Sequence, residues 1–89
     1  MSKIRRDRLK IYGDLLAVLN EEAKKERIVL SRVQVRTNLP FTRLKSFIQD
    51  LIQLGLIEDS LKLTEKGKQY LKEYDHVLNF IKRMGITYR

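Results

Sequence analysis

The sequence predicts a mainly α-helical fold of the α+β class, in which one short hairpin accompanies several helices. Residues 30–64 parse in order as a short helix, a tight turn, a longer helix and a two-stranded hairpin that leads into another helix. Apolar residues recur at three- and four-residue spacing on both sides of this segment, as in amphipathic helices. Only four glycines and one proline interrupt the chain, which is typical of a rigid helical protein. This order predicts a winged helix-turn-helix in a single domain of 89 residues.

The first helix is expected over residues 5–25. Its inward face is one apolar stripe, formed by Leu9, Tyr12, Leu15, Leu16 and Leu19. Gly13 is a mild weak point, since glycine in a helix costs roughly 1 kcal/mol relative to alanine. Glu21 and Lys25 stand four residues apart and are expected to form an ion pair on the polar side.

The second helix is expected over residues 32–37. Ser31 precedes it and is a good N-cap, because its hydroxyl can accept a hydrogen bond from a free backbone N–H. Val33 is the expected inward residue, and Val35 is expected to be partly buried.

The third helix is expected to follow a turn at residues 38–40, with Pro40 in its first turn, and to run to about Leu54. The expected inward residues are Phe41, Leu44, Ile48 and Leu51, with Phe47 and Ile52 beside them. The polar residues Thr42, Arg43, Lys45, Ser46, Gln49, Asp50 and Gln53 are left outside.

The hairpin is expected after Gly55, which suits the left-handed position that ends a helix. Residues 56–58 and 61–63 read as its two short strands, and residues 59–60 have turn chemistry. Thr64 is the expected N-cap of the last helix, which should run to about Met84 and end at Gly85.

The last helix also carries the prediction of a homodimer. A small cysteine-free chain gains no stability from disulfides, and one histidine does not make a zinc site, so self-association is the remaining support. Apolar residues alternate at spacings of four and three, the rhythm of a coiled-coil seam. The expected dimerisation residues are Tyr70, Tyr74, Val77, Leu78, Ile81 and Met84. We expect residues 5–72 to form the winged-helix body with a basic N-terminal arm, and residues 64–85 to form an antiparallel coiled coil. The alternative is a helix that folds back on its own core.

The charge of the chain predicts a polyanionic partner. The net charge is +8 and the isoelectric point is near 10. The excess lies in two segments, +4 over residues 3–10 and +6 over residues 24–45. No long apolar run marks a signal peptide or a membrane span, so a cytoplasmic, nucleoid-associated protein without a membrane partner is expected.

The predicted DNA-binding residues lie on the third helix, on the helix before it and on the N-terminal arm. Polar side chains of a recognition helix reach base edges, while arginine and lysine neutralise phosphates. The candidates are Thr42, Arg43, Lys45, Ser46 and Gln49 on the third helix, Arg32 and Arg36 on the second, and Arg5, Arg6 and Arg8 on the arm. The alternative is that these residues form an ordinary solvated face. At the wing tip Glu58 and Asp59 outnumber Lys62, so we expect either that the wing contributes little or that DNA approaches from the side of the N-terminal arm.

Catalysis is not expected. One histidine and no cysteine provide no nucleophile with a paired base, and no glycine-rich phosphate loop is present. We therefore expect no enzyme, no cofactor, no metal and no small-molecule substrate.

Three stretches resemble a known family. They are IYGDLLAVL in the first helix, SRVQVRTNLPFTRLKSFIQDLIQLGLI through the helix-turn-helix and LKLTEKGKQYL entering the last helix. Together they are similar to the small archaeal winged-helix proteins of the Sulfolobus "ten-a" chromatin type. The resemblance implies a homodimer joined by an antiparallel coiled coil, and duplex DNA binding with little sequence preference. It also implies a chromatin-organising role, with Arg32, Arg36, Arg43 and Lys45 at DNA-facing positions. The acidic wing tip departs from that pattern.

Three functions therefore compete at this point. The first is an architectural DNA-binding dimer, and the second is a sequence-specific transcriptional regulator of the same fold. The third is a protein-interaction module, which explains an apolar last helix but not the uneven charge. RNA binding is also open, although no aromatic stacking surface is evident.

Overall fold

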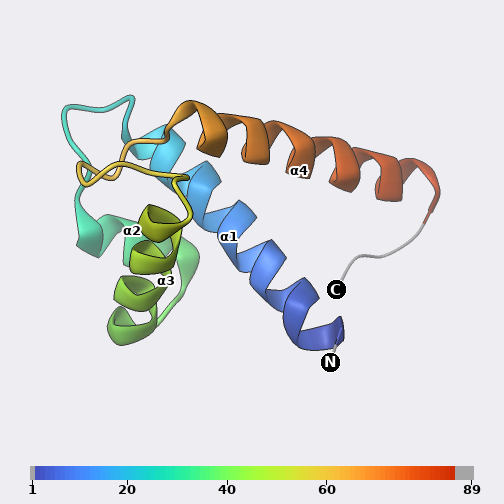
Figure 1. Cartoon of the computed structure of the whole chain (residues 1–89), viewed down its shortest axis with the longest axis horizontal. Helices are drawn as coiled ribbons and strands as arrows, with labels where there is room; N and C mark the ends of the chain where they lie inside the picture. Colours follow the sequence, from blue (N-terminus) through green and yellow to red (C-terminus); the bar gives the residue numbers. More distant parts are fainter. Residues whose placement is uncertain (1, 86–89) are drawn as a thin grey trace.

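A computed structural model of the chain describes residues 2–85, with side chains from residue 8 onward. It contains four helices: α1 (Ser2–Glu22), α2 (Leu30–Thr37), α3 (Phe41–Gln53) and α4 (Glu65–Arg83). Figure 1 shows α1 between α4 on one side and the α2–α3 pair on the other, with the far end of α4 extending away from the rest. In the described part of the chain, no helix is long and apolar enough to cross a membrane.

One hydrophobic core joins the four helices. Its buried apolar residues are Tyr12, Leu15, Leu16, Leu19, Val33, Leu44, Phe47, Ile48, Leu51, Leu56, Ile57 and Leu63. The apolar spacing of the sequence predicted most of this set. Three predictions were wrong: Leu9 is 47% exposed, Val35 is 80% exposed and Phe41 is 46% exposed. Val35 stands two residues after the buried Val33, and two residues turn a helix by roughly 200°, so the two side chains point to opposite sides.

The corner between α2 and α3 depends on backbone geometry rather than on side-chain caps. Helix α2 begins at Leu30 after Val29, with no side-chain cap, so the prediction of Ser31 as the N-cap was wrong. Asn38 adopts a left-handed conformation with φ of 58° and donates its backbone N–H to the carbonyl of Gln34 at 2.9 Å. Asparagine tolerates this conformation better than most residues. Pro40 stands just before α3 rather than in its first turn.

Gly55 ends α3 as predicted. Its φ is 78°, and its N–H bonds to the carbonyl of Ile52 at 3.0 Å while the next N–H, from Leu56, bonds to Leu51 at 2.9 Å. This pair of bonds is the Schellman motif, which satisfies carbonyls that a helix end leaves open. The chain thereby reverses and returns Leu56 to the core.

The wing is smaller than predicted. The two expected strands reduce to a single antiparallel bridge between Ile57 and Leu63. The predicted turn at residues 59–60 is present, closed by a bond of 2.8 Å from the N–H of Leu61 to the carbonyl of Glu58. Leu61 has a φ of 75°, which takes the chain out of the extended conformation and stops the strand.

A hydrogen-bonded cap begins helix α4, and two close contacts hold the helix against the wing and against α1. The Thr64 hydroxyl accepts the N–H of Gly67 at 3.1 Å, which confirms the predicted cap. A Cβ on Gly67 would overlap the carbonyl oxygen of Leu56, and one on Gly13 would lie 2.5 Å from the ring of Tyr74. Gly13 is therefore more than a weak point in α1, since it allows α4 to pack close. At its far end α4 stops before Gly85, whose φ is 75°, as expected.

Candidate nucleic-acid interface

The outward face of α3 is polar, and the one carboxylate of the helix, Asp50, is partly buried and accepts a hydrogen bond from the Tyr12 hydroxyl. The predicted residues Thr42, Arg43, Lys45, Ser46 and Gln49 are all exposed, as is Gln53. At 100° per residue, the four uncharged ones fall within about 60° of one another and form a ridge. Arg43 and Lys45 lie on opposite sides of that ridge. In a groove of duplex DNA, base edges form the floor and phosphates line the two sides. Uncharged hydrogen-bonding side chains between two cations are suited to such a groove.

Both flanking cations are held over aromatic rings. The guanidinium carbon of Arg43 lies 5.3 Å from the centre of the Phe47 ring, and the Lys45 ammonium lies 5.5 Å from that of Phe41. Cation–π attraction of this kind contributes about 0.5–1 kcal/mol at exposed sites. Phe41, which the sequence analysis expected in the core, is half-exposed and supports the exposed Lys45 instead.

Arg8 extends the interface at the far end of α3. It lines a shallow hollow of about 350 Å³ together with Tyr12, Asp50, Gln53 and Leu54. The Tyr12 hydroxyl donates to Asp50 at 3.0 Å. Burial and this hydrogen bond raise the pKa of Tyr12, with Arg8 opposing them. Of the predicted arm residues, the side chains of Arg5 and Arg6 lie outside the described part of the chain, so Arg8 alone can be placed.

Arg32 and Arg36 have internal partners that the sequence analysis missed. Glu22 at the end of α1 is fully buried, and its carboxylate meets Lys25 at 3.3 Å, Arg32 at 3.4 Å and Arg36 at 3.1 Å. Arg36 also bonds to Glu21 at 2.5 Å. The predicted pair of Glu21 with Lys25 is replaced by these contacts.

The environment of Glu22 keeps it ionised. Burial raises the pKa of its carboxyl, but hydrogen bonds from Arg36 and Lys25, with the charges of Lys25 and Arg32, outweigh burial and hold that pKa below its ordinary value. A hydrogen bond from Arg36 also lowers the pKa of Glu21. The sequence contained a sign that Glu22 is buried. Glu22 continues the helical spacing of Leu15 and Leu19 and is the charged residue of that apolar stripe.

The sequence model of the winged helix-turn-helix family matches residues 5–82, which is most of the chain. The chain belongs to the winged helix-turn-helix family. Members are typically DNA-binding domains without enzymatic activity. No curated protein and no solved structure matches the chain.

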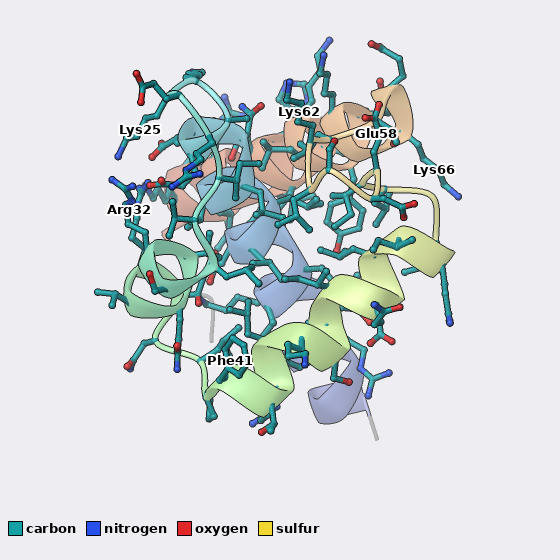
Figure 2. The ribbon with its side chains drawn as sticks, turned by 90° about the vertical axis from the view of Figure 1, so that its left-hand side faces the viewer. Lys25, Arg32, Phe41, Glu58, Lys62 and Lys66 are labelled. Carbon is teal, nitrogen blue, oxygen red and sulfur yellow. The ribbon has the colours of Figure 1, made fainter. Side chains whose placement is uncertain are left out.

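The wing of this winged helix-turn-helix domain presents few cations. Glu58, Asp59 and Lys62 are exposed, and the Ser60 hydroxyl bonds to Glu58 at 3.2 Å. Figure 2 shows Glu58 and Lys62 together on the wing, with Lys66 beyond them. Lys66 donates to the carbonyl of Leu54 at 2.8 Å, so it helps to close the end of α3.

The predicted dimerisation residues divide into two groups. Tyr70 and Tyr74 contact α1 of the same chain, because their hydroxyls bond to Leu9 at 3.1 Å and to Asp14 at 3.4 Å. Val77 and Met84 are exposed, and Leu78 and Ile81 are partly exposed. An apolar groove of about 420 Å³ runs between α1 and α4, lined by Leu9, Leu56, Tyr70, Tyr74, Val77 and Leu78 with Lys66, Gln69 and Glu73 at its edges. Of the expected dimerisation residues, Tyr70 and Tyr74 thus pack within the chain's own fold, whereas Val77 and Met84 are exposed to solvent.

Proposed function

We propose that this winged helix-turn-helix protein binds duplex DNA with α3 in the major groove, as an architectural dimer with low sequence preference. The carrying observation is the outward face of α3, where an uncharged polar ridge lies between Arg43 and Lys45 and the one carboxylate of the helix, Asp50, is partly buried and bonded to Tyr12. A protein surface of this kind is attracted to phosphates along its edges and can enter the groove along its centre.

Phosphate contacts are expected to supply most of the affinity. The chain carries a net charge of +8, and each neutralised phosphate releases condensed counterions, which makes binding strongly dependent on salt. Serine, threonine and glutamine bond to several base edges, so this ridge distinguishes sequences weakly. Similar affinity for unrelated duplexes is the expected consequence.

The dimeric and architectural parts of the proposal depend on α4 and on the resemblance to the "ten-a" chromatin proteins. The exposed Val77, Phe80 and Met84 leave an apolar face on the far half of α4. Two copies that pair through this face would carry two α3 surfaces at a fixed separation. Such a dimer can bridge or bend DNA, which is the role that the resemblance implies.

Fluorescence anisotropy with two unrelated duplexes, repeated across a salt series, tests the proposal. We expect equal affinities and a steep loss of binding with salt. Arg43→Glu should weaken binding about tenfold or more, because it puts a carboxylate beside phosphate. Lys72→Glu, which makes the same change of charge on the exposed face of α4, is the matched control and should lose much less. Equal losses in the two variants, or no binding at low salt, would contradict α3 as the DNA-binding element.

A sequence-specific regulator is the second candidate, and the uncharged ridge of α3 favours it. Thr42, Ser46, Gln49 and Gln53 can all form hydrogen bonds with base edges. Selection of bound duplexes from a random pool distinguishes the two roles. A palindromic motif that Gln49→Ala alters would support the regulator, and a flat result would support the architectural protein.

A further inference from the structure

The junction between α1 and α2 holds an unusual charge arrangement. The Glu22 side chain has no exposed surface, yet it faces Lys25 and Arg32, whose side chains are 52% and 51% exposed. A buried carboxylate is costly unless cations pair with it, and a well-packed apolar residue often serves stability equally well. We therefore interpret the buried carboxylate of Glu22 as a group that holds the exposed side chains of Lys25 and Arg32 in place.

The two arginines at this carboxylate are held differently. Arg36 uses both terminal nitrogens internally, Nη1 on Glu22 and Nη2 on Glu21. Arg32 approaches Glu22 through Nε at 3.4 Å. Its terminal nitrogens make no hydrogen bond within the part of the chain that the structure describes, and they form the edge that pairs with phosphate oxygens. Arg36 is thus occupied, whereas Arg32 is oriented and available.

The available cations surround one hollow. It measures about 350 Å³ and is lined by Lys25, Glu26, Arg27, Val29 and Arg32. Residues 21–36 contain five cations and three carboxylates, an excess of two positive charges even with Glu21, Glu22 and Glu26 counted. Figure 2 shows Lys25 and Arg32 near one another at the edge of the face that also presents α3. A duplex lying on α3 would bring its phosphate backbone toward this edge.

We propose that the hollow at the α1–α2 junction binds one backbone phosphate of the duplex through Arg32 and Lys25, with Glu22 as the positioning residue that orients them. The inference rests on the proposed DNA binding and refines it. Arg36, which the sequence analysis counted as a DNA contact, is assigned instead to the internal ion pairs that connect α1 and α2. Glu26 stands at the hollow as a carboxylate that weakens the site.

The first test compares Arg32→Ala with Arg36→Ala in the same salt series. Losing one phosphate contact reduces the slope of log K against log salt by about 0.9, which corresponds to about an eightfold loss of affinity at 0.1 M salt. We expect this change for Arg32→Ala. Arg36→Ala should keep the slope of the wild type while lowering the melting temperature. The reverse pattern, or equal slopes in both variants, would overturn the assignment.

The second test predicts a gain. Glu26 is exposed, so Glu26→Gln is expected to fold normally and to strengthen DNA binding by removing a charge that repels phosphate. Asp75→Asn removes the same charge from the exposed surface of α4 and is the matched control. A gain for Glu26→Gln that does not exceed that of Asp75→Asn would contradict a phosphate at this hollow.

A double-mutant cycle tests the role of Glu22. Glu22→Gln should weaken binding more in the wild-type background than in the Arg32→Ala background, because part of its effect passes through Arg32 and only the part that passes through Lys25 remains. Glu21→Gln, which removes the same charge beside Arg36 only, should not weaken binding. An equal loss in both backgrounds would make Glu22 merely structural. Should Glu22→Gln fail to fold, the Arg32, Arg36 and Glu26 variants still decide the site. Wild-type protein that binds no duplex would refute the proposed function itself, whereas salt-dependent binding with an unchanged Arg32→Ala slope would refute this inference alone.

Discussion

Helix α3 buries one side in the core and α4 packs Tyr70 and Leu71 against that core, but the two helices expose opposite chemistries. The outer side of α3 carries hydroxyls, amides and two cations, whereas the far half of α4 exposes Val77, Phe80 and Met84 by 51%, 55% and 60%. Exposure alone therefore does not indicate what a helix contacts. The polar face suits a polyanion surrounded by water, and the apolar face suits another apolar surface that excludes water.

The largest expected effect comes from the place where α4 begins. Gly67→Ala would put a methyl group on the carbonyl oxygen of Leu56, which is backbone and has little room to move. We expect a loss of about 3 kcal/mol in the free energy of unfolding, at the upper end for overpacking. Gly55→Ala at the end of α3 is the comparison, because its Cβ has space and only the left-handed φ is strained, at about 1 kcal/mol. Chemical denaturation of both variants measures the difference, and equal losses would show that the contact with Leu56 is unimportant.

The next effect separates self-association from DNA binding. Val77→Asp places a charge on the apolar face of α4 in both copies of a symmetric dimer. At about 1.4 kcal/mol per copy, the dimer dissociation constant should rise roughly 100-fold. Val35→Asp on α2 is the matched variant, since Val35 is also exposed but does not lie on α4. Analytical ultracentrifugation should show a smaller mass for the first variant only, and a wild-type protein that is monomeric at micromolar concentration would remove the dimer proposal.

A smaller effect is expected at the link between the two helices. The Thr64 hydroxyl donates to the carbonyl of Gly55 at 2.6 Å and accepts from the N–H of Gly67 at 3.1 Å, so it joins the end of α3 to the start of α4. Thr64→Ala should cost about 1 kcal/mol, the usual value of an N-cap. Thr64→Ser keeps the hydroxyl and should retain most of the stability in thermal melts. Equal losses for the two variants would show that the methyl group, rather than the hydroxyl, matters.

The sequence predicted the fold well wherever a rule depends on neighbours in the chain. Three- and four-residue spacing identified Leu15, Leu16 and Leu19, and Gly55 marked the end of α3. Contacts between distant residues were the ones missed. Gly13 was interpreted from local helix propensity, although its role depends on the ring of Tyr74 on another helix. The wing has a single β-bridge because Leu61 has a positive φ, a backbone conformation that is unusual for leucine.

The candidate site shows the same division. Helical geometry predicted correctly that Thr42, Ser46 and Gln49 would be exposed on one face. Residue type alone could not distinguish Arg32 from Arg36, because their difference lies in the carboxylates opposite them. Those carboxylates lie on α1, ten or more residues away along the chain. A charge at a buried position of an apolar stripe is the signal that leads to such a network.

The last prediction concerns the dependence of stability on pH at that network. The pKa values of Glu21 and Glu22 in the folded protein lie below the ordinary value of 4.5. A carboxyl whose pKa is lowered by folding contributes stability above its unfolded pKa, and this contribution disappears as the pH falls through the folded pKa. The difference in melting temperature between wild type and Glu22→Gln should therefore be largest near pH 7 and shrink below about pH 4.5. Asp75→Asn on α4 makes no such change in pairing and should show no comparable trend. If the Glu22→Gln difference stayed constant from pH 7 to pH 3, the carboxylate would act through its shape rather than through its charge.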